Sequence, residues 1–125
     1  MPSILVVDDN DDSLRIIQTV LQNNGYAVRT ARSGPEALDL VQKEVPELIL
    51  LDVMMPEMSG FEVLERLRAD APTARVPVIM LTAKAQDEDV IGGYQKGADY
   101  YITKPFTTKQ LLYGIRLVLN QGVAV

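Results

Sequence analysis

Short apolar runs alternate with segments of helical periodicity along nearly the whole chain. The runs predict five strands, at Ile4 to Val7, Tyr26 to Ala31, Leu48 to Leu51, Val76 to Leu81 and Asp99 to Ile102. After each run, apolar residues recur at helical spacing: Leu14, Ile17 and Leu21; Leu38, Val41 and Val45; Phe61, Leu64 and Leu67; Val90, Ile91 and Tyr94; Leu111, Ile115 and Val118. Five such units predict a parallel sheet with helices on both faces.

Turn-forming residues separate these elements. Asn23-Asn24-Gly25 is expected to close the first helix, and Pro46 to stop the second immediately after Val45. Residues 54–60 predict a loop, and Gly122 is placed near the end of the last helix. The sequence thus predicts one continuous α/β domain over residues 1–125.

The composition of the strands predicts their order in the sheet. The first, third and fourth runs are continuously apolar, as expected for strands covered on both faces. The second and fifth runs are more polar and therefore belong at the edges. The order 2-1-3-4-5 satisfies this pattern, and it defines a flavodoxin-like (βα)5 three-layer sandwich.

Polar residues follow four of the predicted strands. Right-handed crossovers bring the carboxyl ends of all five strands to one rim, where ligands bind in folds of this kind. Carboxylates, a hydroxyl and an ammonium group are therefore expected to converge there, from Asp8, Asp9, Asp52, Thr82 and Lys104.

Three neighbouring carboxylates repel one another unless cations intervene. Lys104 supplies one positive charge, and Mg²⁺ is the natural further cation because it accepts one or two carboxylates and leaves room for phosphate oxygens. A carboxylate can attack phosphorus to form an acyl phosphate. Asp52 is the best nucleophile because its strand is central, with the metal and Lys104 balancing the charge of the transferred group.

Each of these residues also has a purely structural interpretation. Asp8 and Asp9 precede a helix, where acids serve as caps, and Asp52 could cap a loop. Threonine is common in strands, and the Lys104–Pro105 dipeptide alone indicates only a turn. The structural interpretation has to account for all of them at the ends of four neighbouring strands, which favours a chemical site.

Composition excludes several other functions. The chain of 125 residues is 47% apolar and 23% charged, carries a formal net charge of −5, and contains neither cysteine nor histidine. Disulfides, thiolate chemistry and Ser-His-Asp catalysis are thereby excluded. No apolar run is long enough to span a membrane, and the acidic balance argues against direct binding of nucleic acid. The lack of disulfides fits a cytoplasmic location.

Four blocks of the sequence resemble the receiver domain of two-component response regulators, the phosphoacceptor module of bacterial signalling. They are the segments 4–9, ending in the acid pair; 48–60, around Asp52; 78–83, containing Thr82; and 97–106, containing Lys104. The resemblance covers essentially the whole chain. It implies a signalling domain that catalyses only its own aspartyl phosphorylation and dephosphorylation, and not a general enzyme.

The resemblance implies a role for each matching residue. Asp52 corresponds to the phosphoacceptor, which receives a phosphoryl group from a sensor histidine kinase, a phosphotransfer protein or a small phosphodonor. Asp9, Asp52 and the main-chain carbonyl of Met54 correspond to ligands of Mg²⁺ or Mn²⁺, and Asp8 acts through metal-bound water. Two positions, Met54 and Lys84, help to set the phosphate lifetime in the family. Met54 predicts slower self-dephosphorylation than an amide there.

The remaining implied roles concern the switch. Thr82 corresponds to the switch hydroxyl that bonds the phosphoryl group, Lys104 pairs with that group, and Tyr101 is the switch aromatic. The Lys104–Pro105 peptide bond is usually cis in this family. Phosphorylation is expected to reshape the surface formed by the fourth predicted helix, the fifth strand and the last helix. The partner there is a downstream effector or a fused output domain, and homodimerisation on phosphorylation is a further option.

Three alternatives remain open at the level of sequence. A phosphatase of the haloacid-dehalogenase type also uses an aspartate after a strand, but it requires a second acid where Met54 stands. A flavodoxin requires a phosphate-binding loop after the first strand, where the acidic residues 8–12 would repel phosphate. A degenerate receiver would bind partners without being phosphorylated.

Overall fold

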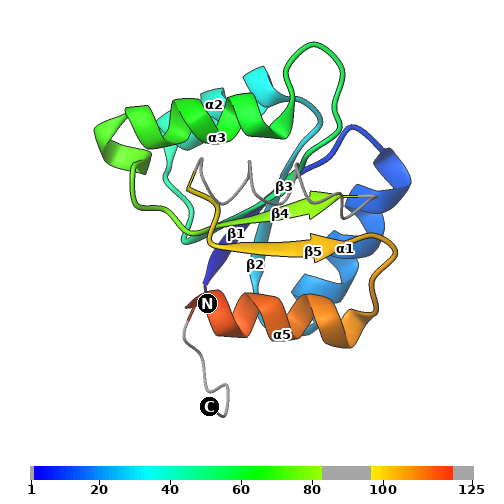
Figure 1. The fold of residues 1–125 in the computed structure, drawn as a ribbon. Coiled ribbons are helices and arrows are strands. Elements are labelled where there is room, and N and C mark those ends of the chain that lie inside the picture. The colour runs from blue at the N-terminus through cyan, green and yellow to red at the C-terminus, as the bar shows by residue number, and fades with distance from the viewer. Residues whose placement is uncertain (1, 83–96, 120–125) are drawn as a thin grey trace.

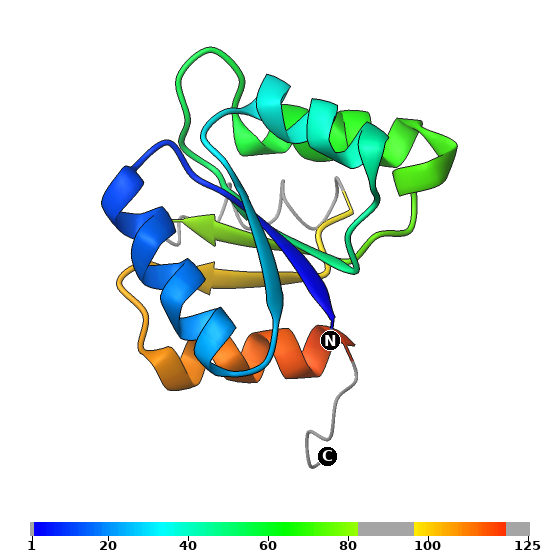
Figure 2. The same cartoon turned by 180° about the vertical axis from the view of Figure 1, so that it is seen from behind.

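The computed structural model describes residues 2–82 and 97–119 of the chain. Five parallel strands form one sheet in the order β2-β1-β3-β4-β5. Helices α2 and α3 cover one face of the sheet, and α1 and α5 cover the other (Figure 1, and from behind in Figure 2). The predicted strand order and three-layer architecture are confirmed.

The elements follow one another along the chain as strand and helix. Their bounds are β1 Ser3–Val7, α1 Asp11–Asn23, β2 Ala27–Ala31, α2 Gly34–Lys43, β3 Leu48–Asp52, α3 Gly60–Ala69, the short 3-10 helix η1 Ala71–Thr73, β4 Val78–Thr82, β5 Tyr100–Thr103 and α5 Thr108–Leu119. The fourth predicted helix, around residues 90–94, lies outside the described residues, as do Lys84 and Gly122.

The sheet separates two apolar cores. Alternate residues of β3 point to opposite faces, as the two-residue repeat of a strand requires. Ile49 and Leu51 join the core beneath α2 and α3, while Leu48 and Leu50 join the core beneath α1 and α5. All five residues of β3 are buried, whereas β2 is mostly half-buried. The burial therefore agrees with the strand composition, which predicted β3 at the centre of the sheet and β2 at an edge.

Several predicted boundaries were wrong by one or two residues. Helix α2 ends at Lys43, so Val45 lies outside it and is 39% exposed. A residue before proline is pushed towards extended backbone, and here the extended backbone begins already at Glu44. Strand β4 begins at Val78, immediately after Pro77, and not at Val76. Strand β5 starts and ends one residue later than predicted.

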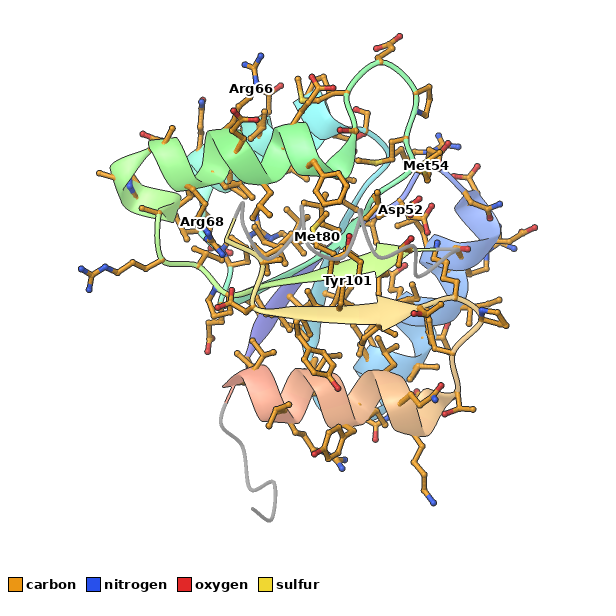
Figure 3. All side chains as sticks on the ribbon, in the orientation of Figure 1. Asp52, Met54, Arg66, Arg68, Met80 and Tyr101 are labelled. Atoms are coloured by element: carbon orange, nitrogen blue, oxygen red, sulfur yellow. The ribbon has the colours of Figure 1, made fainter. Side chains whose placement is uncertain are left out.

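Arg68 links three segments of the chain at the amino-terminal end of the sheet. From α3, its guanidinium donates to the carbonyls of Val76 (2.6 Å) and Gly97 (2.8 Å) and pairs with the Asp99 carboxylate at 3.1 Å. The same carboxylate oxygen accepts from the N–H of Val78 at 2.8 Å. One side chain thereby connects α3 to the segments that lead into β4 and β5. Figure 3 labels Arg68 at this end of the sheet.

Both ends of the described chain lie at this amino-terminal end of the sheet (Figures 1 and 2). The carbonyl of Ser3 accepts from the N–H of Glu47 at 2.9 Å, and Glu47 and Leu119 line one shallow groove. Within residues 2–82 and 97–119, none of the helices is long and apolar enough to cross a lipid bilayer.

Candidate functional site

Four neighbouring strands deliver polar side chains to the opposite end of the sheet. Asp8 follows β1 directly, Asp52 is the last residue of β3, Thr82 is the last residue of β4, and Lys104 follows β5. Asp52 is in register with Leu81, one residue before Thr82. The strands therefore bring together the residues that the sequence pattern placed at this rim, and Figure 3 shows Asp52 there.

The first turn of α1 fixes the backbone beside Asp8. Asn10 is the amino-terminal cap of the helix, because its side chain accepts from the N–H of Ser13 at 2.9 Å. The N–H of Asn10 in turn donates to Oδ1 of Asp8 at 3.0 Å. The structural interpretation of Asp8 and Asp9 as helix caps is therefore wrong, since a neighbouring asparagine performs that task. An asparagine shortly before the helical pattern was the signal for it.

The site combines buried acids with one lysine. Asp8 is fully buried and Asp52 is 6% exposed, whereas Asp9 is exposed. The Nζ atom of Lys104 lies 2.8 Å from Oδ2 of Asp8 and 3.8 Å from Oδ1 of Asp52. Lys104 is thus hydrogen-bonded to Asp8 and lies within ion-pair distance of Asp52. The Lys104–Pro105 peptide bond is cis.

The surroundings of Asp52 alter its acidity. Burial raises the pKa of the Asp52 carboxyl from its ordinary value of 3.8 to about 6, against the opposing effect of the Lys104 charge. The negative charge of Asp8 and a hydrogen bond with its side chain also raise the pKa of Asp52, while the N–H of Met54 lowers it by donating to the carboxylate. The site therefore holds more negative charge than its one lysine neutralises.

The three acids fit a divalent cation. Asp8, Asp9 and Asp52 each offer a carboxylate oxygen, and these oxygens all lie within 4.8 Å of one another. Oxygen donors of this kind are the ligands that Mg²⁺ prefers, and a bound cation would relieve the charge imbalance at Asp52. Met54 is 71% exposed on the loop after β3, beside the same site.

Thr82 and Tyr101 occupy different surroundings on adjacent strands. Thr82 is 2% exposed at the end of β4. Tyr101 is half-buried on β5, is in register with Met80, and packs against the core beneath α2 and α3. Figure 3 shows both labelled side chains, Met80 and Tyr101, on that face of the sheet.

Two further residues that shape the site were not assigned a role from sequence. Gly60, the first residue of α3, lies directly against the main chain of Asp52 and Val53. Asn10, as described above, holds the turn beside Asp8. Residues 54–60 were predicted as a loop, whereas Gly60 begins α3. Its contact with β3 depends on how α3 packs, which sequence spacing does not contain.

Comparison with known proteins identifies the family. The family model of the response regulator receiver domain matches residues 4–116, which is most of the chain. The chain therefore belongs to the response regulator receiver domain family, and it is a signalling domain of two-component systems. This membership decides against the haloacid-dehalogenase and flavodoxin alternatives.

Curated relatives in this family include three transcriptional regulators. The chain is 41% identical to the DNA-binding dual master transcriptional regulator RpaA of Synechocystis, over 97% of this chain and 50% of that protein. It is 42% identical to the transcriptional regulatory protein AfsQ1 of Streptomyces coelicolor, over 98% and 53%. It is 41% identical to the alkaline phosphatase synthesis transcriptional regulatory protein PhoP of Bacillus subtilis, over 95% of this chain and 49% of that protein. The chain spans about half the length of these relatives.

Solved structures show the same fold over nearly their whole length. The chemotaxis protein CheY4 of Vibrio cholerae superimposes with a TM-score of 0.91 and 36% identity, covering 94% of this chain and 98% of that one. The receiver domain of Francisella response regulator 1452 gives a TM-score of 0.89 and 33% identity, covering 97% and 98%. The flavodoxin-like, CheY-like fold is thereby shown.

Proposed function

We propose that residues 1–125 form one receiver domain that accepts a phosphoryl group on Asp52 in a reaction that requires Mg²⁺ or Mn²⁺. The observation that carries this proposal is the buried Asp52 carboxylate, which ends a central strand between two further acids and an ammonium group. Family membership supports the same chemistry. The donor is a phosphohistidine of a sensor histidine kinase or phosphotransfer protein, or a small phosphodonor such as acetyl phosphate.

The metal ligands are Asp9, Asp52 and the main-chain carbonyl of Met54, while Asp8 acts through a metal-bound water. When bound, the cation supplies positive charge that stabilises the anionic phosphoryl group during transfer. The fully buried Asp8 has a second task, because its carboxylate holds the Nζ of Lys104 at 2.8 Å. It thereby keeps the ammonium within reach of the Asp52 carboxylate.

The transfer itself is a displacement at phosphorus. A carboxylate oxygen of Asp52 attacks, and the new O–P bond forms as the P–N bond to the donor histidine breaks. The imidazole nitrogen keeps the bonding electron pair and takes a proton from water. Lys104 then pairs with an oxygen of the transferred group, which carries more negative charge than the carboxylate it replaces.

The switch uses Thr82 and Tyr101. The phosphoryl group attracts the Thr82 hydroxyl at the end of β4, and Tyr101 on the adjacent strand turns inward into the space that this opens. Tyr101 already packs partly against the core under α2 and α3, so a small change in its rotamer alters the surface beside β5 and α5. That surface binds a downstream effector or an output domain fused to the receiver.

The names of the relatives suggest the kind of output. RpaA is described as a DNA-binding transcriptional regulator, and this chain matches about half of its length. We therefore propose that this receiver controls a regulator of transcription, with DNA contacted by other parts of the assembly and not by this acidic domain. Pairing of two phosphorylated copies is part of this proposal.

Intact-mass spectrometry tests the proposed chemistry. The chain is incubated with acetyl phosphate, with and without Mg²⁺, beside Asp52→Asn and the matched control Asp39→Asn, whose carboxylate is exposed on α2. We expect one added phosphoryl group in the wild type and in Asp39→Asn, only with Mg²⁺, and none in Asp52→Asn. A wild type that neither gains mass nor binds beryllofluoride would be a degenerate receiver, and the proposal would fail.

A further inference from the structure

Gly60 makes the closest backbone approach at the site. A Cβ atom at this position would overlap the carbonyl oxygen of Asp52 and would lie 2.9 Å from Cα of Val53. Both are main-chain atoms, so no side-chain rotation relieves the overlap. The first residue of α3 therefore has to be glycine for the helix to begin against the end of β3.

This approach also closes the loop that carries Met54. The N–H of Gly60 donates to the carbonyl of Val53 at 2.9 Å, so the two ends of the loop over residues 53–59 are joined. Within that loop Met54 stands two residues after Asp52, and its main-chain N–H lies close enough to the Asp52 carboxylate to lower the pKa of that group. Figure 1 shows the loop arching away from the sheet between β3 and α3, and Figure 3 labels Asp52 and Met54 at its base.

We propose that Gly60 is a positioning residue for the metal site, because its missing side chain sets the Met54 main chain against the Asp52 carboxylate. This inference rests on the metal ligands proposed above. A Cβ at Gly60 must displace either β3 or the start of α3. Strand β3 is bonded to β1 and β4, and the N–H of Val53 donates to Leu81 at 2.9 Å, so the loop and α3 are the parts that yield.

The expected consequence is a weaker metal site with intact chemistry. Displacement of the loop separates the Met54 carbonyl from the carboxylates, while Asp52 and Lys104 stay on the sheet. We expect Gly60→Ala to weaken Mg²⁺ and Mn²⁺ affinity at least about tenfold. The rate of phosphorylation by acetyl phosphate at saturating Mg²⁺ should remain within about threefold of the wild type, since the nucleophile has not moved.

The chain offers a matched control at Gly34. It is the first residue of α2 and follows a capping serine, Ser33, just as Gly60 follows Ser59. A Cβ at Gly34 would meet the Sδ atom of Met58 and the Cγ2 atom of Val63, each at 2.8 Å, and both atoms belong to side chains and not to the main chain. Gly34→Ala therefore introduces an overlap with side chains of the loop and of α3 but not with the main chain of Asp52 and Val53, and its metal affinity should stay within twofold of the wild type.

The experiment measures metal binding directly. Mn²⁺ affinity of the unphosphorylated wild type, Gly60→Ala and Gly34→Ala is determined by paramagnetic resonance, and the Mg²⁺ dependence of phosphorylation by intact mass. Circular dichroism checks folding, and trimethylamine N-oxide is added to all samples if Gly60→Ala is partly unfolded. Equal Mn²⁺ affinity of Gly60→Ala and wild type would overturn the inference, as would an equal loss in Gly34→Ala.

A second measurement needs no variant. Coupling between Gly60 and the metal is reciprocal, so metal binding should strengthen the Gly60–Val53 hydrogen bond. Hydrogen exchange of the Gly60 amide should slow on addition of Mg²⁺ by at least about tenfold, and by more than that of Ala37, whose N–H bonds to Ser33 in α2. Unchanged exchange at Gly60 with Mg²⁺ bound would refute the proposal.

The outcomes separate this inference from the proposed function. A wild type that binds Mn²⁺ through a Gly60-dependent site but gains no phosphoryl group leaves the inference standing and removes the phosphoacceptor proposal. If the wild type is phosphorylated with Mg²⁺ and Gly60→Ala binds the metal as tightly as the wild type does, the phosphoacceptor proposal stands and the inference about Gly60 fails. A wild type without measurable Mn²⁺ binding overturns both metal roles.

Discussion

Replacing Asp52 by asparagine is expected to stabilise the fold at alkaline pH. Burial raises the pKa of this carboxyl from 3.8 to about 6, so the folded protein holds the proton more tightly than the unfolded chain. The stability that this group contributes is therefore fully present below pH 3.8 and is lost as the pH rises through 6. Above that range, folding has to bury an ionised carboxylate.

The size of the effect follows from the pKa difference. At about 1.36 kcal/mol per pKa unit, the rise corresponds to about 3 kcal/mol at pH 8. At pH 5 the folded carboxyl is still mostly protonated, and linkage gives about half of that amount. Since asparagine is neutral at both values, Asp52→Asn should raise the free energy of unfolding by these amounts, with the larger gain at pH 8.

Urea unfolding in EDTA at pH 5 and pH 8 measures both quantities. Asp9→Asn is the matched control, because Asp9 belongs to the same acid cluster but is exposed, and its variant should change stability by less than about 0.5 kcal/mol. A gain for Asp52→Asn that is equal at the two pH values would refute burial of charge as the cause. So would a loss of stability at pH 8.

Metal removal gives the complementary result in the same assay. Mg²⁺ in place of EDTA should stabilise the wild type by about 1.4 kcal/mol for each tenfold excess over its dissociation constant. Asp52→Asn lacks one of the carboxylates and should gain less, so the difference between the two proteins at pH 8 should shrink. A difference that Mg²⁺ leaves unchanged would contradict Asp52 as a metal ligand.

Three further predictions concern single side chains. Arg68→Met should lower the free energy of unfolding by about 2–4 kcal/mol in urea titrations, because several carbonyls and Asp99 lose a charged donor. The control Arg66→Met, at an exposed position of the same helix, should change it by less than about 0.5 kcal/mol. Thr73→Val should cost about 1–2 kcal/mol in the same titrations, since the buried hydroxyl donates to Leu67 at 2.6 Å. Met54→Asn should lose its phosphoryl group faster than Met54→Ala, measured by intact mass over time, because an amide orients water; the reverse order would refute it.

Sequence patterns were most informative where one physical effect dominates. The continuous burial of Leu48 to Leu51 reflects coverage on both faces, and this alone separates a central strand from an edge strand. The rim residues followed equally directly, because parallel strands all end at one side. Strand order and the position of Asp52 at the end of a central strand were therefore predictable from the sequence.

Features that depend on packing across the sheet were not predictable in this way. The hydrogen bonds of Arg68 reach Gly97, 29 residues away, and nothing in local spacing distinguishes it from the exposed Arg66. The overlap that excludes a side chain at Gly60 exists only once α3 lies against β3. The end of α2 was also predicted too late, because the backbone becomes extended at Glu44, two residues before Pro46.

The shared location of Ser3 and Leu119 has a practical consequence for attachments. Both lie at the end of the sheet opposite Asp52, and a five-residue strand separates the two ends by roughly 17 Å. A purification tag, a fluorophore or a second domain joined at either residue by a short tether would leave the acidic rim accessible to a large donor protein. The point of attachment of such a domain would lie one strand length from Asp52, so a change at Asp52 would reach that point through the intervening strands and helices.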